Sequence, residues 1–512
     1  MFGLPTEEQI RDVGRGLGLH LTPGDLELFG ELITEQLADA DDFLNERLDE
    51  GMPEVLYPRR APGWRPTVEE DPYNAWIWRS EIAGSDDGLL KGKTVSVKDH
   101  IAVAGLPISW GSRVFDGLVA PYDATVVSRA LAAGATVIGK NTHHGFSGLK
   151  SMGGGLGDYW SAINPRSPEL QTGGSSSGPA AAVAAGEVDI AYGGDQGGSI
   201  RHPAAYCGVV GLKPTYGLVS HAGAFYGGEP TIDHIGPMAR TVQDVALGLE
   251  AVAGYDGQDS RQGRDVPDGV DVVRHVDTGV RGTRVGILRE GFDDEHGTEI
   301  SKSIRAAVEA LERAGAEVSE VSIPEHISVL RPASLLQLSG MRAVRNGGPF
   351  ILGRDAFVPT SFVAAVNRAW ADHADEMGAF LRLTWLCGEF THQRFSGAVL
   401  AKAHNVRRHF VRAYDSALRD VDVLVMPTCP VPTPRVSAPQ GHDAARRREL
   451  DVLAEVFPTY RNLQPFNYTG HPAIAVPCGE VVEGIASMQI VGRPFGEADL
   501  LRVAKVVEDT AV

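Results

Sequence analysis

Residues 171–201 read QTGGSSSGPAAAVAAGEVDIAYGGDQGGSIR, in which two turns rich in glycine and serine flank one short helix and one short strand. Pro179 is expected to open the helix and Gly186 to end it, since proline suits the first helical turn and glycine suits a helix end. Val188–Tyr192 is then predicted to be a buried strand that runs into the second turn. A strand joined to helices by such turns is typical of an α/β sheet.

The same alternation of helices and strands recurs on both sides of this stretch. Strands are predicted at Thr94–Lys98, Ala135–Gly139, Ala316–Val321 and Asp422–Met426, and helices at Thr125–Ala133 and Ser303–Ala314. Residues 330–415 carry long helical patterns with few strand signals and are expected to cover one edge of the sheet. We therefore predict the α/β class, with a mixed central β-sheet covered by helices on both faces.

The first sixty or so residues are expected to form an N-terminal helical extension. Thr22 and Pro23 supply a cap and a first-turn proline, and apolar side chains follow at helical spacing at Leu26, Phe29, Ile33 and Leu37. A stretch rich in proline and charge at 52–72 is interpreted as a linker. We predict a helical segment over 1–65 and a single larger domain over 66–512. The apolar face of the segment must be buried, which suggests a homodimer.

The composition of the 512-residue chain is that of a globular protein, with 43% hydrophobic and 22% charged residues. Its formal net charge of −19 argues against nucleic acid or an anionic membrane as a partner, because both require basic surfaces. The four cysteines are scattered without a CxxC pair, which argues against a thiolate zinc site and for reduced thiols. No secretory signal or bilayer-spanning run is visible, so we expect a cytoplasmic protein.

The second turn has the composition of an oxyanion-binding loop. Its glycines leave successive backbone amides accessible, so those of Gln196, Gly197, Gly198 and Ser199 could be directed at one oxygen atom. Phosphate binding is the competing interpretation, but neither turn matches the phosphate-loop pattern or the dinucleotide pattern GxGxxG. No cofactor is therefore expected, and Ser199 becomes the hydroxyl to be activated.

The base that would activate Ser199 is either a histidine or a lysine. The histidines weighed as candidates, none with a telling partner in the sequence, are His143, His144, His221, His234 and His471. Lys98 stands inside the predicted strand VSVK, where desolvation disfavours its charged form and would make it neutral near working pH. The alternative for Lys98 is a surface lysine whose amine reaches solvent.

Taken together, Lys98, the first serine turn and GGDQGGSIR resemble the amidase signature family. The matching run covers 171–220, and further matches lie at VSVKDHIAVAGLP, at TIDHIGPMARTVQD (231–244), at DVLVMPT and at FNYTGHPAIAVPCG (466–479). The resemblance spans roughly residues 70–510 and is more specific than a short motif. The sequence DQGGSIR and the helical extension are most similar to the bacterial amidases associated with nitrile degradation.

This resemblance implies a fold, a site and a reaction. The fold is the amidase signature fold, and the reaction is hydrolysis of a small carboxamide to a carboxylic acid and ammonia through an acyl-enzyme, without cofactor or metal. The implied triad has Ser199 as nucleophile, Ser175 as a bridging serine preceded by a cis peptide bond, and Lys98 as base. Ser176 is implied as a neighbouring hydroxyl in the substrate-binding region. The amides of the second turn are implied as the oxyanion donors, and Asp195 and Arg201 are interpreted as braces of that turn.

The sequence departs from the common family pattern at several positions. His100 stands where asparagine is common, Trp110 where a smaller residue is usual, and His143-His144 in a segment that often carries an acidic residue. These departures, with the nearby aromatic residues Phe146, Tyr159 and Trp160, leave the substrate open.

The alternative functions are a glutaminase-type amidotransferase subunit, a biosynthetic acyl transferase that uses an amine in place of water, and a non-catalytic binding protein. The intact triad residues argue against the last of these.

Overall fold

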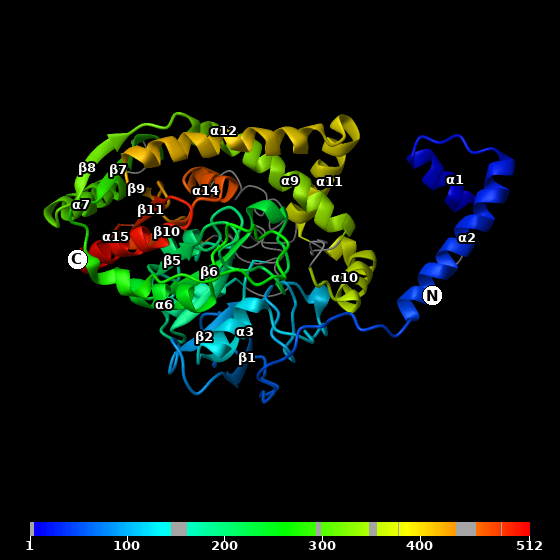
Figure 1. Cartoon of the computed structure of the whole chain (residues 1–512), viewed down its shortest axis with the longest axis horizontal. Helices are drawn as coiled ribbons and strands as arrows, with labels where there is room; N and C mark the ends of the chain where they lie inside the picture. Colours follow the sequence, from blue (N-terminus) through cyan, green and yellow to red (C-terminus); the bar gives the residue numbers. More distant parts are fainter. Residues whose placement is uncertain are drawn as a thin grey trace. The chain divides into compact units, whose positions relative to one another are not determined.

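The computed structural model describes residues 5–144, 161–292, 298–347, 356–376, 378–436, 457–482 and 484–511 (Figure 1). The aromatic residues Phe146, Tyr159 and Trp160 lie outside these ranges. The contacts between residues divide the chain into two compact units, Met1–Met52 and Pro53–Val512. The predicted boundary between residues 65 and 66 therefore falls within the second unit, and the domain division stays a prediction.

The N-terminal unit consists of helices α1 (Glu7–Gly16) and α2 (Pro23–Asn45). Each helix begins at a threonine whose hydroxyl accepts the backbone N–H of the third helical residue, while that residue's side chain bonds back to the threonine amide. These capping boxes satisfy backbone donors that would otherwise lack partners. The predicted helix opened by Thr22 and Pro23 is confirmed.

The larger unit is built around one mixed sheet. Its strands within the described residues are β1 (Trp76–Ala83), β2 (Thr94–Lys98), β3 (Thr136–Asn141), β4 (Ile190–Asp195), β5 (Val210–Lys213), β6 (His234–Ala239), β7 (Arg284–Leu288), β8 (Glu317–Val321), β9 (Val423–Pro427), β10 (Ala473–Val481) and β11 (Gly484–Gly492). They are ordered β1-β3-β2-β4-β6-β5-β10-β11-β9-β7-β8. The pairs β2–β3, β2–β4, β7–β8 and β7–β9 are parallel and the other neighbours antiparallel, which confirms the predicted mixed sheet.

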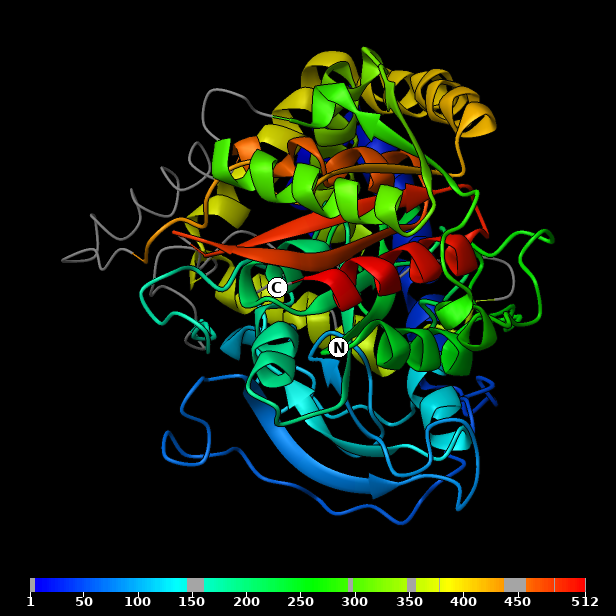
Figure 2. The ribbon, with the colours of Figure 1, turned by 90° about the vertical axis from the view of Figure 1, so that its left-hand side faces the viewer.

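Helices cover both faces of this sheet, as predicted. One face packs against α3 (Thr125–Ala132), α6 (Val242–Val252), α7 (Thr298–Arg313) and α15 (Glu497–Thr510), and Figure 2 shows α7 and α15 in front of the strands. The other face packs against α4 (Ser177–Ala184) and α5 (Arg201–Cys207). Side chains along β4 alternate between these layers: Ile190 and Tyr192 join the first core and Ala191 joins the second.

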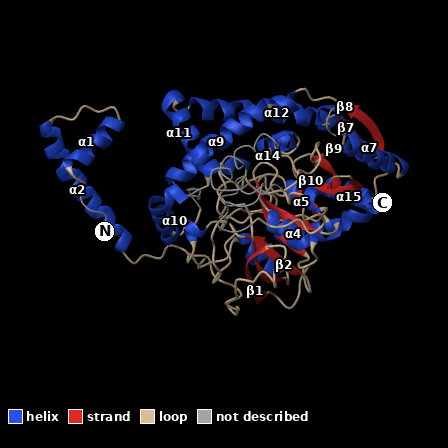
Figure 3. Ribbon diagram, turned by 180° about the vertical axis from the view of Figure 1, so that it is seen from behind, coloured by secondary structure: helices blue, strands red, loops and turns tan. Residues whose placement is uncertain are grey.

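Long helices follow β8, as the pattern over 330–415 predicted. They are α9 (Leu330–Gly347), α10 (Thr360–His373), α11 (Ala379–Phe395) and α12 (Ala398–Asp420), preceded by the short α8 (Glu325–Ser328). Helices α9, α11 and α12 pack on one another, and the short α14 (Gln464–Thr469) packs against α9 and α12 (Figure 3). In the part of the chain that is described, no helix has the length and apolarity to cross a bilayer.

Several predicted element boundaries are wrong by two or more residues. Helix α7 begins at Thr298 instead of Ser303, and strand β3 ends at Asn141 instead of Gly139. Strand β4 covers Ile190–Asp195 instead of Val188–Tyr192, because its glycines pair with β6: Gly193 lies opposite Gly236 and Asp195 opposite His234. Helix α4 begins at Ser177, two residues before the proline that was expected to open it. Proline is tolerated there because the first turn of a helix needs no intrahelical N–H donor.

The stretch at 52–72 is irregular, as expected of a linker, but part of it is fixed to the sheet. The Trp64 amide donates to the Arg79 carbonyl over 2.9 Å, and the Arg79 amide donates back over 2.8 Å. Arg60 forms an ion pair with the buried Asp123. Residues from about 60 onward therefore belong structurally to the larger unit.

Candidate active site

Lys98 is the last residue of β2 and is fully buried. Because β2 and β4 are parallel, with Val97 opposite Tyr192, both strands deliver their C-terminal ends to the same edge of the sheet. Lys98 Nζ lies 2.7 Å from Ser175 Oγ, to which it donates a hydrogen bond. The lysine predicted as base and the serine predicted as bridge are thus in direct contact.

Ser175 lies in the first turn, immediately before α4. The peptide bond between Gly174 and Ser175 is cis. The Ser175 carbonyl accepts the His144 amide over 3.0 Å, and a Cβ atom at Gly174 would overlap the His144 ring. Glycine at 174 therefore allows the turn to pack directly against His144.

Ser176 connects the two turns. Its amide donates to the Ser199 carbonyl over 3.1 Å, its hydroxyl donates to the Gly194 carbonyl over 3.0 Å, and the Gly194 amide donates back to that hydroxyl over 3.3 Å. This bridge fixes the turn that carries Ser199 against the turn that carries Ser175. Ser199 retains 9% of its surface exposed.

Asp195 and Arg201 brace the second turn, as predicted. The Asp195 carboxylate accepts both the Nε and a terminal nitrogen of Arg201 over 3.1 Å, and it also accepts the amides of Gly198 over 2.6 Å and Ile200 over 3.1 Å. Burial opposes the ionisation of Asp195, but Arg201, Asn467 and Lys213 together outweigh it and lower the pKa of this carboxyl below its ordinary value. Removing either partner would leave a buried charge uncompensated.

The predicted oxyanion donors are not equivalent in the structure. Gly198 has a φ of +121°, and its amide is the one that donates to Asp195. The Gly198 amide is therefore already occupied, and we expect the amides of Gln196, Gly197 and Ser199 to be the donors to the oxyanion.

The electrostatics of the site favour a neutral amine. Burial lowers the pKa of Lys98 from 10.5 to about 7, against the opposing effects of Asp233 and Asp195. Burial also lowers the pKa of His100 and His143 well below its usual value, so these neighbouring histidines are neutral as well. Lys98 is the candidate base whose side chain has a described hydrogen bond to the hydroxyl of a predicted triad serine.

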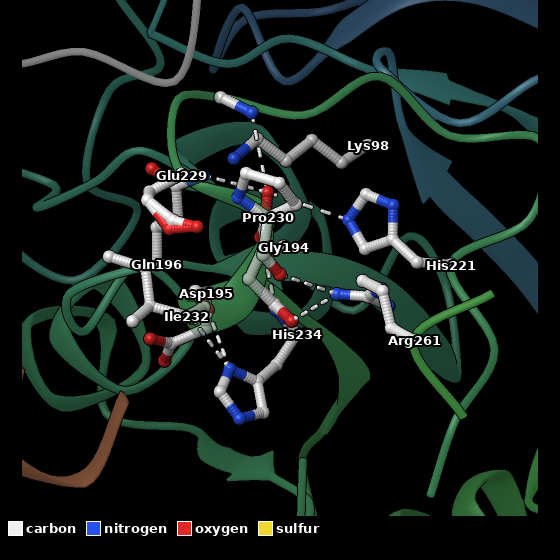
Figure 4. A network of polar contacts seen from close by, with 12 residues as sticks. Lys98, Gly194, Asp195, Gln196, His221, Glu229, Pro230, Ile232, His234 and Arg261 are labelled. Atoms are coloured by element: carbon white, nitrogen blue, oxygen red, sulfur yellow. Dashed lines mark hydrogen bonds and ion pairs between the residues drawn. The ribbon is translucent and has the colours of Figure 1, made fainter. Parts of the chain in front are cut away.

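Asp233, which is buried immediately before β6, had no role predicted from the sequence. Its carboxylate accepts the side-chain amide of Gln196 over 2.9 Å. Figure 4 shows Gln196 close to Lys98, Gly194 and Asp195. The two residues are 37 positions apart and meet because β6 pairs with β4. Asp233 stands in TIDHIGPMARTVQD, one of the segments that resemble the amidase signature family. The sequence alone did not show which side chain this aspartate would contact.

A sequence model of the amidase family matches residues 74–501. The chain is 35% identical over 512 residues to an enantioselective amidase of Rhodococcus rhodochrous, and the match covers 98% of this chain and 95% of that protein. It is 36% identical over 452 residues to the A-type subunit of the glutamyl-tRNA(Gln) amidotransferase of Natronomonas pharaonis, with 85% of this chain and 99% of that protein covered.

Solved structures show the same fold. The corresponding glutamyl-tRNA(Gln) amidotransferase subunit of Thermotoga maritima superposes with a TM-score of 0.65 at 29% identity, covering 84% of this chain and 85% of its own. The peptide amidase of Stenotrophomonas maltophilia gives a TM-score of 0.65 at 28% identity, with 83% of each chain covered. The family match extends over most of the chain, and the fold agrees with it: this chain belongs to the amidase signature family.

Proposed function

We propose that the protein is an amidase that hydrolyses a carboxamide to a carboxylic acid and ammonia, through an acyl-enzyme on Ser199. The observation that carries the proposal is the 2.7 Å contact between Lys98 Nζ and Ser175 Oγ, in a site where burial lowers the pKa of the lysine to about 7. A lysine that is largely neutral at mildly alkaline pH acts as a general base without a histidine.

In the proposed reaction, Ser199 Oγ attacks the amide carbonyl carbon. Its proton passes to Ser175 Oγ while the Ser175 proton passes to Lys98 Nζ, and backbone amides of the second turn stabilise the oxyanion. The proton then returns along the same path to the leaving nitrogen, so that the C–N bond breaks and ammonia departs. Water attacks the resulting ester with the help of the same relay, which releases the acid and restores Ser199.

The similarity to amidotransferase subunits supports a second candidate function, that of one subunit in an amidotransferase complex. The match to the Rhodococcus amidase covers 98% of this chain and the match to the Natronomonas protein 85%. The amidase thus shares a larger part of the chain, which favours hydrolysis by this protein alone. Purification with a partner protein that is required for activity would favour the role in a complex instead.

The first test is a screen of the purified chain for ammonia released from aliphatic, aromatic and amino-acid amides, with glutamine included. Ser199→Ala is expected to abolish turnover, and a fluorophosphonate is expected to label Ser199. Ser176→Ala serves as the control for the labelling site: it removes the neighbouring hydroxyl together with its two bonds to Gly194, so the rate is expected to fall while the label stays on Ser199. Labelling at Ser176, or ammonia released from glutamine only when a partner is present, would contradict the proposal.

A further inference from the structure

The oxyanion turn is held on one side by Asp195 and Arg201, and on the other side by a second buried carboxylate, that of Asp233. Asp233 is 4% exposed and lies between a short 3₁₀ turn, Pro230–Ile232, and strand β6. Antiparallel pairing places His234 opposite Asp195, so Asp233 sits beside the residue that follows β4. That residue is Gln196, the first residue of the turn.

The Asp233 carboxylate is occupied mainly by neutral donors. One oxygen accepts the Gln196 side-chain amide over 2.9 Å and the Gly227 amide over 3.3 Å, and the other accepts the His234 amide over 3.0 Å. His221 Nε2 lies 3.5 Å from the first oxygen. These contacts converge on one side chain and satisfy it, as a buried carboxylate requires, and they tie the Gln196 side chain to the start of β6.

Lys98 lies beside the end of β4 from which both carboxylates are placed: its Nζ would be 3.7 Å from a Cβ atom at Gly194, the residue before Asp195, and Asp195 lies opposite His234, the residue after Asp233. The two carboxylates differ in how their charge is balanced. Asp195 forms two hydrogen bonds with the Arg201 guanidinium, which offsets its charge. Arg261, the arginine drawn in Figure 4, donates instead to the Asp259 carboxylate and to the backbone oxygen of Asp233. Among the described contacts, the Asp233 carboxylate has no direct guanidinium bond of the kind that Asp195 has, and Arg261 and His221 act on its charge without one.

We propose that Asp233 is a positioning residue for the reaction at Ser199: its carboxylate fixes the Gln196 side chain of the oxyanion turn and supplies the buried negative charge that acts on Lys98. The inference rests on the proposed function, because Lys98 must gain a proton from Ser175 as Ser199 attacks. A nearby carboxylate stabilises the lysine ammonium formed in that step. Without it, burial alone would make Lys98 too weak a base.

The charged and titratable groups around Lys98 and Asp233 come from every neighbouring strand. They are His100 and Asp99 after β2, Lys140 on β3 in an ion pair with Asp99, His143 after β3, Asp195 on β4, His234 on β6, and His221 and Arg261 beside Asp233. Burial keeps His100 and His143 neutral, and Arg201 keeps Asp195 charged. His221 is tested separately with His221→Gln. In the labelling experiment described next, this variant is expected to leave unchanged the pH at which the rate falls on the acidic side.

The experiment measures the rate at which a fluorophosphonate labels Ser199 in the full chain between pH 5 and 9. Asp233→Asn is expected to lower the plateau rate by about tenfold or more and to move the acidic limb down by about one pH unit, since removing the carboxylate makes Lys98 easier to deprotonate but less basic. A variant that only distorts the structure would lower the maximal labelling rate without changing the pH at which the rate falls on the acidic side. Asp259→Asn is the matched control, because it removes a buried carboxylate bonded to the same Arg261 and should leave the limb unmoved.

Gln196→Met provides a second test in case Asp233→Asn does not fold. It removes the amide that Asp233 fixes while keeping the carboxylate, and it is expected to lower the plateau about tenfold with the limb near its original pH. An unmoved limb in folded Asp233→Asn, or a wild-type plateau in Gln196→Met, overturns the inference. If the wild-type chain is not labelled at Ser199 at all, the proposed function fails instead, so the two failures are distinguishable.

Discussion

At the scale of single residues, burial converts Lys98 from a cation into a base. With its pKa lowered to about 7, the neutral fraction rises about tenfold between pH 6 and pH 8. We expect kcat/KM for an amide substrate to rise by the same factor over this range and to level off above it. Lys98→Ala should lower this rate by at least about 10³-fold. Lys98→Arg should be equally slow, because the guanidinium group stays protonated. A limb near pH 7 that survives in Lys98→Ala would assign the base to a histidine.

The same burial predicts that Lys98 reduces the stability of the fold. Between pH 7 and pH 10.5 the unfolded chain binds more protons at this lysine than the folded chain does, so stability falls as pH falls through this window and is constant below it. The full shift corresponds to about 5 kcal/mol at pH 7, and loss of the Ser175 contact costs about 1 kcal/mol. Lys98→Met should therefore raise the free energy of unfolding at pH 7 by a few kcal/mol. Denaturant titrations at pH 7 and pH 9.5 should show the gain shrinking as pH rises.

The residues of the proposed triad could be named from the sequence because each stands in a motif that is continuous along the chain. Lys98 stands in VSVKDHIAV, and Ser175 and Ser199 stand in the two glycine-rich turns. Asp233 could not be given a role in the same way. Its contact with Gln196 depends on the pairing of β6 with β4, which no local pattern specifies.

At the scale of elements, the turn between β4 and α5 depends on one glycine more than on the other. Gly198 has a φ of +121°, and a Cβ atom there would lie 2.6 Å from Leu463 Cβ. At Gly197 the nearest atom to such a Cβ would be Gln464 Cγ, at 3.9 Å. We expect Gly198→Ala to distort the turn and lower kcat by at least about 10²-fold. Gly197→Ala should keep most of its rate, measured with the same amide. Equal losses in the two variants would contradict this account of the turn.

Prediction at this scale succeeded where local periodicity determines the element. Helix α2 begins at the capping residue that the sequence indicated, and β2 has the predicted bounds. The predicted boundaries that were wrong by two or more residues are both ends of β4, the start of α4, the start of α7 and the end of β3. In β4, glycines that read as a loop in the sequence are held as a strand by cross-strand pairing. Tertiary contacts of this kind are not visible in a local pattern.

At the scale of the whole molecule, the N-terminal unit leaves apolar side chains on its surface. Leu28 and Leu32 of α2 are 54% and 53% exposed, and Phe43 is 64% exposed. Leu28 and Leu32 lie one helical turn apart and so share a face, which a second copy of the chain would bury. We therefore expect the full chain to be a homodimer in light scattering. A double variant, Leu28→Glu with Leu32→Glu, should weaken that dimer without changing the labelling of Ser199.

Two truncations distinguish the expected part of the N-terminal unit in dimer formation from its effect on the stability of the larger unit. Removing residues 1–52 keeps the contacts of Arg60 with Asp123 and of Trp64 with Arg79, whereas removing residues 1–65 deletes both. Both truncated chains should have the mass of a monomer. The shorter one should also unfold at a lower temperature, because Asp123 then loses its buried partner. A soluble chain without residues 1–52 that has twice the mass of its own monomer would show that the dimer contact lies in the larger unit, Pro53–Val512.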